Sequence, residues 1–188
     1  MCSSDLLRLR PLAAELPERA LADGDIDLAV GTILSPSASM RVSTLYRETF
    51  LAVVRRGHPC LDAPITPEVY AALDHVLIAQ PGDGPGLADA ALAARGLTRT
   101  VVLRTPHFLS VAALVASSDL VCTMPARIAR SASRAHALVT FEPPVDVSGF
   151  DVAMYWHPRR ERDPAVRWLR DELRAAASEL QRSMDVGA

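Results

Sequence analysis

Five histidines are the residues of this sequence with the broadest chemistry, because imidazole is a common metal ligand and general base. They stand at positions 58, 75, 107, 136 and 157, and no two have the HExxH spacing that places two imidazoles on one helix face. His107 differs from the others because it follows a predicted strand and begins a predicted helix, where open α/β sheets bind ligands. We therefore expect no metal site, and His107 is a candidate ligand-facing residue.

Three further motifs have a structural interpretation that is simpler than a catalytic one. Cys122 lies within the apolar run 120–124 and no GxSxG sequence is present, so we expect a buried, inert thiol and not a nucleophile. The loop 81–86 is glycine-rich, but it lacks the lysine of a phosphate-binding loop and its two prolines remove N–H donors. The acidic run 23–27 lacks the spacing of a calcium loop. We expect no catalytic residue and no cofactor.

The opening of the chain predicts a strand, a helix and a second strand, which is a βαβ-like order. Leucine and arginine alternate over 6–10 as in a half-buried strand, and 17–22 has a helical pattern. Residues 26–30 form a mostly apolar run of the kind that is buried on both faces of a parallel sheet. The next predicted elements are strands 41–47 and 49–55 and a short helix that Thr66 and Pro67 begin and that ends at residue 73.

From residue 75 onward, predicted strands and helices alternate. Such alternation predicts a parallel-dominated sheet with helices on its faces. The C-terminal helix has the clearest signals, since Asp163 suits the N-cap, Pro164 suits the first helical position and apolar residues recur with helical spacing. The predicted elements are strand 75–80, helix 87–95, strand 101–104, helix 107–116, strand 120–123, helix 125–135, strands 138–141 and 151–156, and the helix from residue 164.

Composition excludes several classes of protein. With 188 residues, 49% of them hydrophobic, the chain can bury a core, and its formal net charge of -2 gives no basic excess for nucleic acid. The three cysteines are too far apart for a zinc knuckle and indicate no disulfide framework. Charged residues interrupt the N-terminus, and no apolar run has the length of a membrane span. We expect a cytoplasmic protein that binds neither nucleic acid nor membrane directly.

Several short segments follow one another in a specific order. They are ALADGDIDLAVG at 20–31, RRGHP at 55–59, RTPHF at 104–108, SDLVCTMP at 118–125, and WHPR at 156–159 with WLR at 168–170. Together they resemble the effector-binding (substrate-binding) domain of LysR-type transcriptional regulators, and in particular its nodulation-regulator-like branch. The resemblance covers nearly the whole chain.

This resemblance implies an α/β fold of the type 2 periplasmic-binding-protein kind, in which a ligand cleft lies between two α/β lobes. Lobe I is expected at 1–74 and 159–188, and lobe II at 75–158. Family members begin with a winged helix-turn-helix, whereas this chain starts at what resembles the second strand of the sensing domain. We therefore expect an incomplete first lobe that lacks the first strand and helix, and a truncated regulator is the hypothesis.

The resemblance also implies the residues of an effector site, because strand ends and helix starts line the cleft in this family. A small-molecule effector is the expected partner. The expected effector-binding residues are Gly31, Thr32, Thr105, Pro106, His107, Phe108, Thr123, Met124 and Pro125.

Two other functions stay open. A solute-binding protein or a small-molecule enzyme could use the same two-lobed fold, but the first would require an export signal and the second a convergent acid/base pair. Alternatively, the chain could form a homo-oligomer, or a dimer with a full-length regulator that it blocks. Co-purification with an intact regulator would distinguish this last function from effector sensing alone.

Overall fold

A computed structural model describes residues 6–11, 17–32, 36–79 and 84–185 of the chain, with side chains up to residue 182 at the C-terminal end. The chain forms two compact units, the first made of residues 1–47 and 151–188 and the second of residues 48–150. These boundaries differ from those expected after residues 74 and 158. The difference arises because the strand at 50–55 pairs with strands of the second unit, and the strand at 150–156 pairs with a strand of the first.

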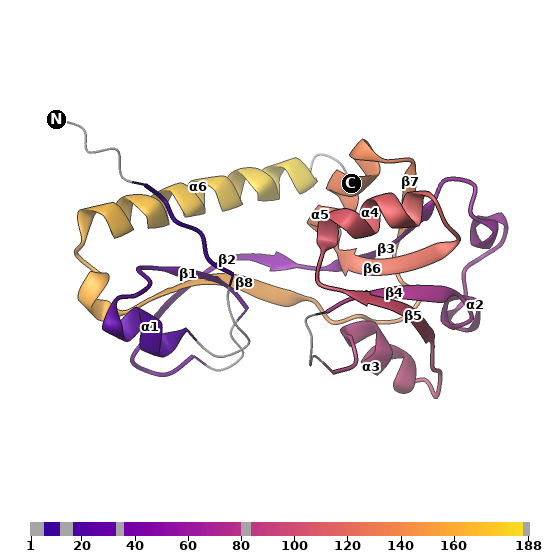
Figure 1. The fold of residues 1–188 in the computed structure, drawn as a ribbon, viewed down its shortest axis with the longest axis horizontal. Coiled ribbons are helices and arrows are strands. Elements are labelled where there is room, and N and C mark those ends of the chain that lie inside the picture. Colours follow the sequence, from indigo (N-terminus) through magenta and orange to yellow (C-terminus); the bar gives the residue numbers. More distant parts are fainter. Residues whose placement is uncertain (1–5, 12–16, 33–35, 80–83, 186–188) are drawn as a thin grey trace. The chain divides into compact units, whose positions relative to one another are not determined.

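The first unit contains a three-stranded sheet in the order β1 (Ala29–Gly31), β8 (Phe150–Trp156) and β2 (Arg41–Glu48). Its helices are α1 (Glu18–Asp23) and α6 (Pro164–Asp185), with the short 3-10 helix η2 (Pro158–Arg160) before α6 (Figure 1). β1 runs antiparallel to β8, with Val30 opposite Met154. Leu21, Met40 and Tyr155 belong to the buried cluster of this unit.

Two expectations for the opening of the chain are wrong. Residues 6–10 are irregular, with Leu6, Leu7 and Leu9 exposed, because the alternating pattern finds no partner strand among the described residues. The strand expected at 26–30 begins only at Ala29, pairs antiparallel, and leaves Val30 39% exposed. The opening is therefore not a βαβ unit in the part of the chain that the structure describes.

The predicted start of the C-terminal helix is confirmed. The carboxylate of Asp163 accepts hydrogen bonds from the backbone N–H groups of Ala165 (3.0 Å) and Val166 (3.3 Å), which have no partner within the helix. Arg170 stacks on the indole of Trp156 at 4.4 Å, so α6 is attached to β8.

The second unit contains a five-stranded sheet in the order β5 (Thr100–Thr105), β4 (Asp74–Ile78), β6 (Leu120–Pro125), β3 (Phe50–Arg55) and β7 (Leu138–Phe141). β4 is parallel to both β5 and β6, whereas β3 is antiparallel to both β6 and β7. The sheet is therefore mixed, and the expected dominance of parallel pairs is wrong. Parallel pairing is limited to β4, β5 and β6, the three strands that helices connect. The strand at 50–55 runs antiparallel to both of its neighbours.

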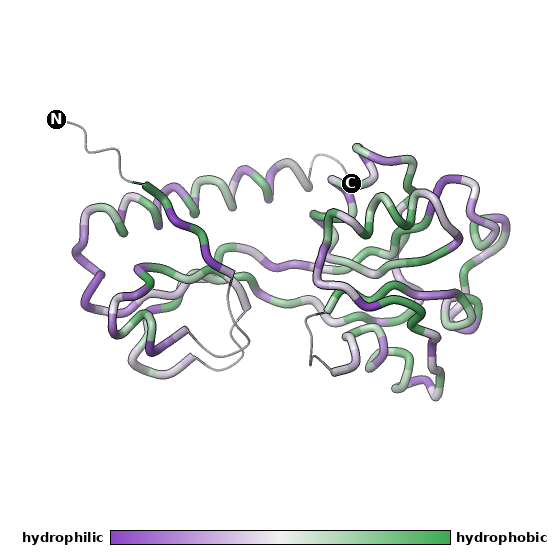
Figure 2. The backbone as a smooth tube through the Cα atoms, viewed as in Figure 1, coloured by the Kyte–Doolittle hydropathy of each residue, from purple (hydrophilic) through white to green (hydrophobic). Residues whose placement is uncertain are grey.

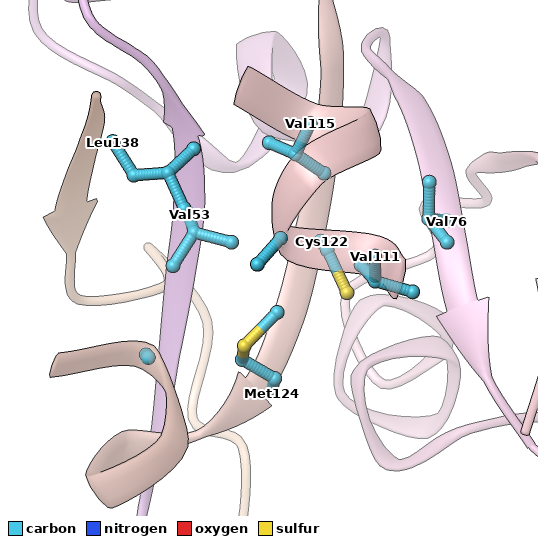
Figure 3. Packing of buried hydrophobic residues seen from close by; sticks show 9 residues of the cluster. Val53, Val76, Val111, Val115, Cys122, Met124 and Leu138 are labelled. Carbon is cyan, nitrogen blue, oxygen red and sulfur yellow. The ribbon is translucent and has the colours of Figure 1, made fainter. Parts of the chain in front are cut away.

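Helices cover both faces of this sheet (Figure 1). On one face α4 (Phe108–Ala116) and α5 (Ala126–Ala135) pack on a core that includes Val53 and Cys122, as Figure 3 shows. On the other face lie α2 (Pro67–Ala71) and α3 (Leu87–Ala93), with a core that includes Leu92 and Val121. The 3-10 helix η1 (Pro59–Asp62) precedes α2.

Apolar residues predominate in β3 and β6 of the second unit (Figure 2). Because side chains alternate across a strand, neighbours in β6 contribute to opposite faces, Val121 to the α2/α3 core and Cys122 to the α4/α5 core. The same alternation places Thr123 on the α2/α3 face and Met124 in the α4/α5 core.

The α3 packing gives a stability prediction. Leu92 is fully buried, so we expect Leu92→Ala to lower the free energy of unfolding by about 2–5 kcal/mol through lost burial and a residual cavity. Leu109→Ala is the matched control, because Leu109 is 89% exposed and its loss should change the free energy by less than about 0.5 kcal/mol. Both tryptophans, Trp156 and Trp168, lie in the first unit, so urea unfolding is best followed by far-UV circular dichroism. Equal effects of the two substitutions would contradict the packing described.

Candidate functional site

A pocket of about 400 Å³ lies in the second unit, at the edge of the sheet where β4 and β6 end. The carboxyl ends of parallel strands are where open α/β sheets bind ligands. Most of the pocket wall is apolar, and Thr123 and Arg99 contribute its polar side chains. The lining residues are Phe50, Leu77, Ile78, Ala79, Gly84, Pro85, Gly86, Leu87, Ala88, Arg99, Thr123 and Val147.

Gly86 shapes one side of the pocket. Its N–H donates to the carboxylate of Asp89 at 2.5 Å, which closes the first turn of α3. A Cβ atom at this position would lie 2.8 Å from the side chain of Leu77 and 3.4 Å from the guanidinium of Arg99. A side chain at this position would therefore require the end of the Leu77 side chain to shift. Gly84 and Gly86 come from the glycine-rich loop noted in the sequence, of which residues 81–83 lie outside the described part of the chain.

The Arg99 side chain is 2% exposed and is held by acceptors. Its Nε and Nη2 atoms donate to the two carboxylate oxygens of Asp89 at 2.6 and 3.1 Å, which is a bidentate ion pair. Its Nη1 donates to Nδ1 of His75 at 3.0 Å. Burial alone would raise the pKa of Asp89, but the hydrogen bonds and charge of Arg99, with the Gly86 N–H, outweigh burial and lower it.

His75 is fully buried and hydrogen-bonded on both ring nitrogens. Nε2 donates to the backbone carbonyl of Tyr70 at 2.8 Å, and Nδ1 accepts from Arg99, which is the pattern of a neutral imidazole. Burial, with a smaller contribution from the charge of Arg99, lowers the pKa of His75 to about 4. These bonds give His75 a structural role.

Tyr70 links His75 to the pocket. Its ring meets the imidazole of His75 edge-on at a centroid distance of 4.8 Å, and its hydroxyl is hydrogen-bonded to the hydroxyl of Thr123. Burial raises the pKa of Tyr70, and the hydrogen bond with Thr123 and the charge of Arg99 oppose this rise. Five side chains thus form one connected group, which we call the polar network: Tyr70, His75, Asp89, Arg99 and Thr123.

The effector-binding residues expected from the sequence are not all brought to this pocket. Thr123 lines it, whereas Met124 is fully buried in the α4/α5 core and points to the opposite face of the sheet. Pro125 ends β6. Thr105, Pro106, His107 and Phe108 join the end of β5 to the start of α4 and do not contribute to the pocket wall.

The two remaining expected residues lie in the first unit. Gly31 ends β1, and the hydroxyl of the adjacent Thr32 donates to the backbone carbonyl of Asp151 at 3.2 Å. Contact of these residues with an effector stays a prediction, as it does for residues 105–108.

Of the residues that line the pocket, only Thr123 was expected as a site residue. Among those missed are Phe50 and Arg99 of the wall and Tyr70 and Asp89 of the polar network. Arg99 is one arginine among 20 basic residues, and nothing in its neighbourhood distinguishes it. Asp89 had a usable signal, because an acidic residue three positions after a glycine N-cap is typical of a first helical turn.

Other chemistry is limited in the described residues. Cys122 is buried, and burial raises the pKa of its thiol to about 12, in line with the inert role expected. Among the residues that the structure describes, no three His, Cys, Asp or Glu side chains group so that they could hold a metal ion. No helix in the described ranges is long and apolar enough to cross a membrane.

The Asp89–Arg99 pair gives a second stability prediction. Asp89→Asn keeps the shape and hydrogen-bonding oxygen of the side chain but leaves the buried guanidinium without its counter-charge, so we expect a loss of about 2–3 kcal/mol in the free energy of unfolding. Asp171→Asn is the control, because the Asp171–Arg174 pair is exposed and contributes little. Denaturant titration of both variants measures the two losses in the free energy of unfolding. An unchanged stability of Asp89→Asn would contradict the expected contribution of the Asp89–Arg99 pair.

The pKa of His75 predicts how stability depends on pH. Between pH 6.5 and about 4 the unfolded chain binds a proton on this residue and the folded protein does not, so stability falls as the pH falls through this window. The loss at pH 4 is about 3 kcal/mol, since each pKa unit corresponds to about 1.4 kcal/mol. His75→Gln should remove this part of the pH dependence, whereas the exposed control His136→Gln should retain it. Urea titrations at pH 7 and pH 4 measure the difference, and parallel curves for all three proteins would contradict the prediction.

Comparison with known proteins places this geometry in a family. Residues 6–178 match the model of the LysR substrate binding domain. The chain is 37% identical over 159 residues to the HTH-type transcriptional regulator SyrM of Rhizobium meliloti (strain 1021), covering 84% of this chain and 49% of that protein. It is 30% identical over 174 residues to Nodulation protein D of Bradyrhizobium sp. (strain ANU 289), covering 92% of this chain and 51% of that protein.

The fold is also similar to a solved structure. The regulatory domain of MexT, a transcriptional activator in Pseudomonas aeruginosa, superposes with a TM-score of 0.71 at 29% identity, covering 84% of this chain and 76% of that chain. The periplasmic-binding-protein-like α/β fold expected from the sequence is thereby confirmed, as is the resemblance to nodulation regulators. The chain spans about half the length of the curated relatives it matches. It belongs to the LysR substrate-binding-domain family of transcriptional regulators.

Proposed function

We propose that this chain is the effector-sensing region of a transcriptional regulator and that the pocket of the second unit binds the effector. One observation carries the proposal: a pocket at the carboxyl ends of parallel strands combines apolar walls with the hydroxyl of Thr123 and the buried guanidinium of Arg99. Small-molecule sites have this composition, in which few polar groups orient a mostly apolar ligand. A volume of about 400 Å³ falls within their usual range of roughly 300–1,000 Å³.

The composition of the wall favours binding over catalysis. The described residues that line the pocket include no carboxylate and no histidine, so no acid/base pair faces a bound molecule. A small organic compound with an apolar body and one or two polar groups fits such a wall. Its binding would favour one conformation of the chain over others, and a regulator acts through such a shift. We further propose that this occurs in the cytoplasm, with DNA contacted by a helix-turn-helix region and not by the residues described.

Ligand binding and its location are tested together. We expect a panel of small carboxylic acids, ketones and aromatic compounds to contain members that raise the melting temperature saturably, as binding to the folded state requires. Ala79→Phe should abolish this stabilisation, because Ala79 lines the pocket and its backbone N–H is fixed on the carbonyl of Thr105, so the ring would fill the space.

Leu109→Phe is the matched control for added bulk, since Leu109 is exposed on α4 and does not line the pocket. The measurements are differential scanning fluorimetry followed by isothermal titration of the compounds that stabilise. Two outcomes would contradict the proposal: no compound stabilises the folded wild-type protein, or Ala79→Phe binds as tightly as Leu109→Phe.

A further inference from the structure

Within the polar network, Arg99 can only donate hydrogen bonds. A guanidinium has five N–H donors and no acceptor, so each of its partners must accept. The carboxylate of Asp89 and Nδ1 of His75 accept three of these bonds. Arg99 therefore offers no acceptor for the hydroxyl hydrogen of Tyr70.

The hydroxyl hydrogen of Tyr70 needs an acceptor other than Arg99. Its side chain is fully buried, and its hydroxyl carries one hydrogen, for which Thr123 is the partner among the described residues. His75 does not compete, because its Nε2 donates to the backbone carbonyl of Tyr70 and not to the hydroxyl. If Thr123 donated to Tyr70, the buried phenolic hydrogen would have no acceptor, which is costly in a protein interior. The phenol therefore donates and Thr123 accepts.

Thr123 is then left with one hydrogen, its own. The residue lines the pocket, and no acceptor for its O–H is found among the described residues. We propose that Tyr70 is a positioning residue that fixes the Thr123 hydroxyl as a hydrogen-bond donor, so that the pocket selects ligands that present a carboxylate or carbonyl oxygen. This inference rests on the proposed function, since it concerns the ligand of the same pocket.

The charges around the pocket largely cancel, so the Thr123 hydroxyl determines which ligand chemistry is preferred. Asp89 pairs with Arg99 through two hydrogen bonds, so the pair contributes no net charge to the wall. A purely electrostatic preference for anions is therefore weak, and a neutral carbonyl should be accepted as well as a carboxylate. The ligand oxygen receives the last bond of a chain that runs from Tyr70 through Thr123, and such chains strengthen each member.

Matched probe pairs test the direction of this chain. Benzoate and benzamidinium have the same planar shape, but the first only accepts and the second only donates hydrogen bonds. Acetophenone and aniline form a neutral pair that removes the effect of charge. Further pairs of carboxylates and amidines on other small carbon skeletons extend the panel, and dissociation constants are measured by isothermal titration for the wild type, Thr123→Val, Thr123→Ser and Tyr70→Phe.

We expect the wild type to bind the acceptor of each pair at least tenfold more tightly than the donor. Thr123→Val should weaken the acceptor probes roughly tenfold, the usual effect of one hydrogen bond to a ligand, and Thr123→Ser should restore them. Tyr70→Phe releases the Thr123 oxygen to accept, so donor probes should bind more tightly and the ratio of the two dissociation constants should approach one.

The outcomes distinguish this inference from the function on which it rests. If no probe of any pair binds the folded wild type, both are overturned. If probes bind but donors and acceptors bind equally, or if Tyr70→Phe weakens both members of each pair in parallel, Tyr70 has only a structural role and the pocket function stands alone. A change in the ratio with Tyr70→Phe is a result that general loss of packing does not produce. Circular dichroism of each variant establishes that it is folded.

Discussion

A buried guanidinium is the constraint on which the second unit depends. A charge taken out of water is tolerated only when it is paired and fully hydrogen-bonded. Arg99 precedes β5, and its partners come from α3 and β4, so meeting this requirement joins three elements that are separate in sequence. The Gly86 N–H donates to the same carboxylate of Asp89, and a Cβ at Gly86 would displace the end of the Leu77 side chain. The polar network thereby fixes the start of α3 against the sheet and shapes one side of the pocket.

The sheet separates this polar chemistry from the dry core. Alternate residues of β6 face opposite sides, so the α4/α5 face receives Cys122 and Met124 while the α2/α3 face receives Thr123. The α4/α5 face is closed by aliphatic packing, and its thiol is inert because burial raises the pKa of Cys122 to about 12. The α2/α3 face tolerates a polar network because the hydrogen-bonding groups of Arg99, His75 and Tyr70 are partners of one another there. One strand can therefore serve a rigid core and a ligand pocket at the same time.

Sequence patterns predicted the elements of the second unit and the C-terminal helix because those signals are local. Asp163 and Thr66 cap their helices as expected, and the apolar runs at β3, β4 and β6 are buried. The expected strand at 6–10 failed because a strand requires a partner, which periodicity cannot supply. The pairing direction of β3 failed for the same reason. In the site, the order of motifs identified Thr123, but it grouped that residue with Met124, whose side chain takes the other face. Arg99 and Tyr70 could not be found, because their role arises from contacts between residues far apart in sequence.

The arrangement also separates the residues that touch a ligand from those that determine what it is. The pocket wall is largely aliphatic, and a wall of this kind discriminates poorly between molecules of similar shape. Among the described residues of the wall, discrimination then depends on the Thr123 hydroxyl, and Tyr70 imposes the direction of its hydrogen from behind the wall. Tyr70 is not among the residues that line the pocket, so the loss of its hydroxyl leaves the lining side chains in place. A substitution one layer behind the wall can therefore alter the preferred ligand chemistry while the pocket keeps its volume, whereas substitutions of the aliphatic lining alter size alone.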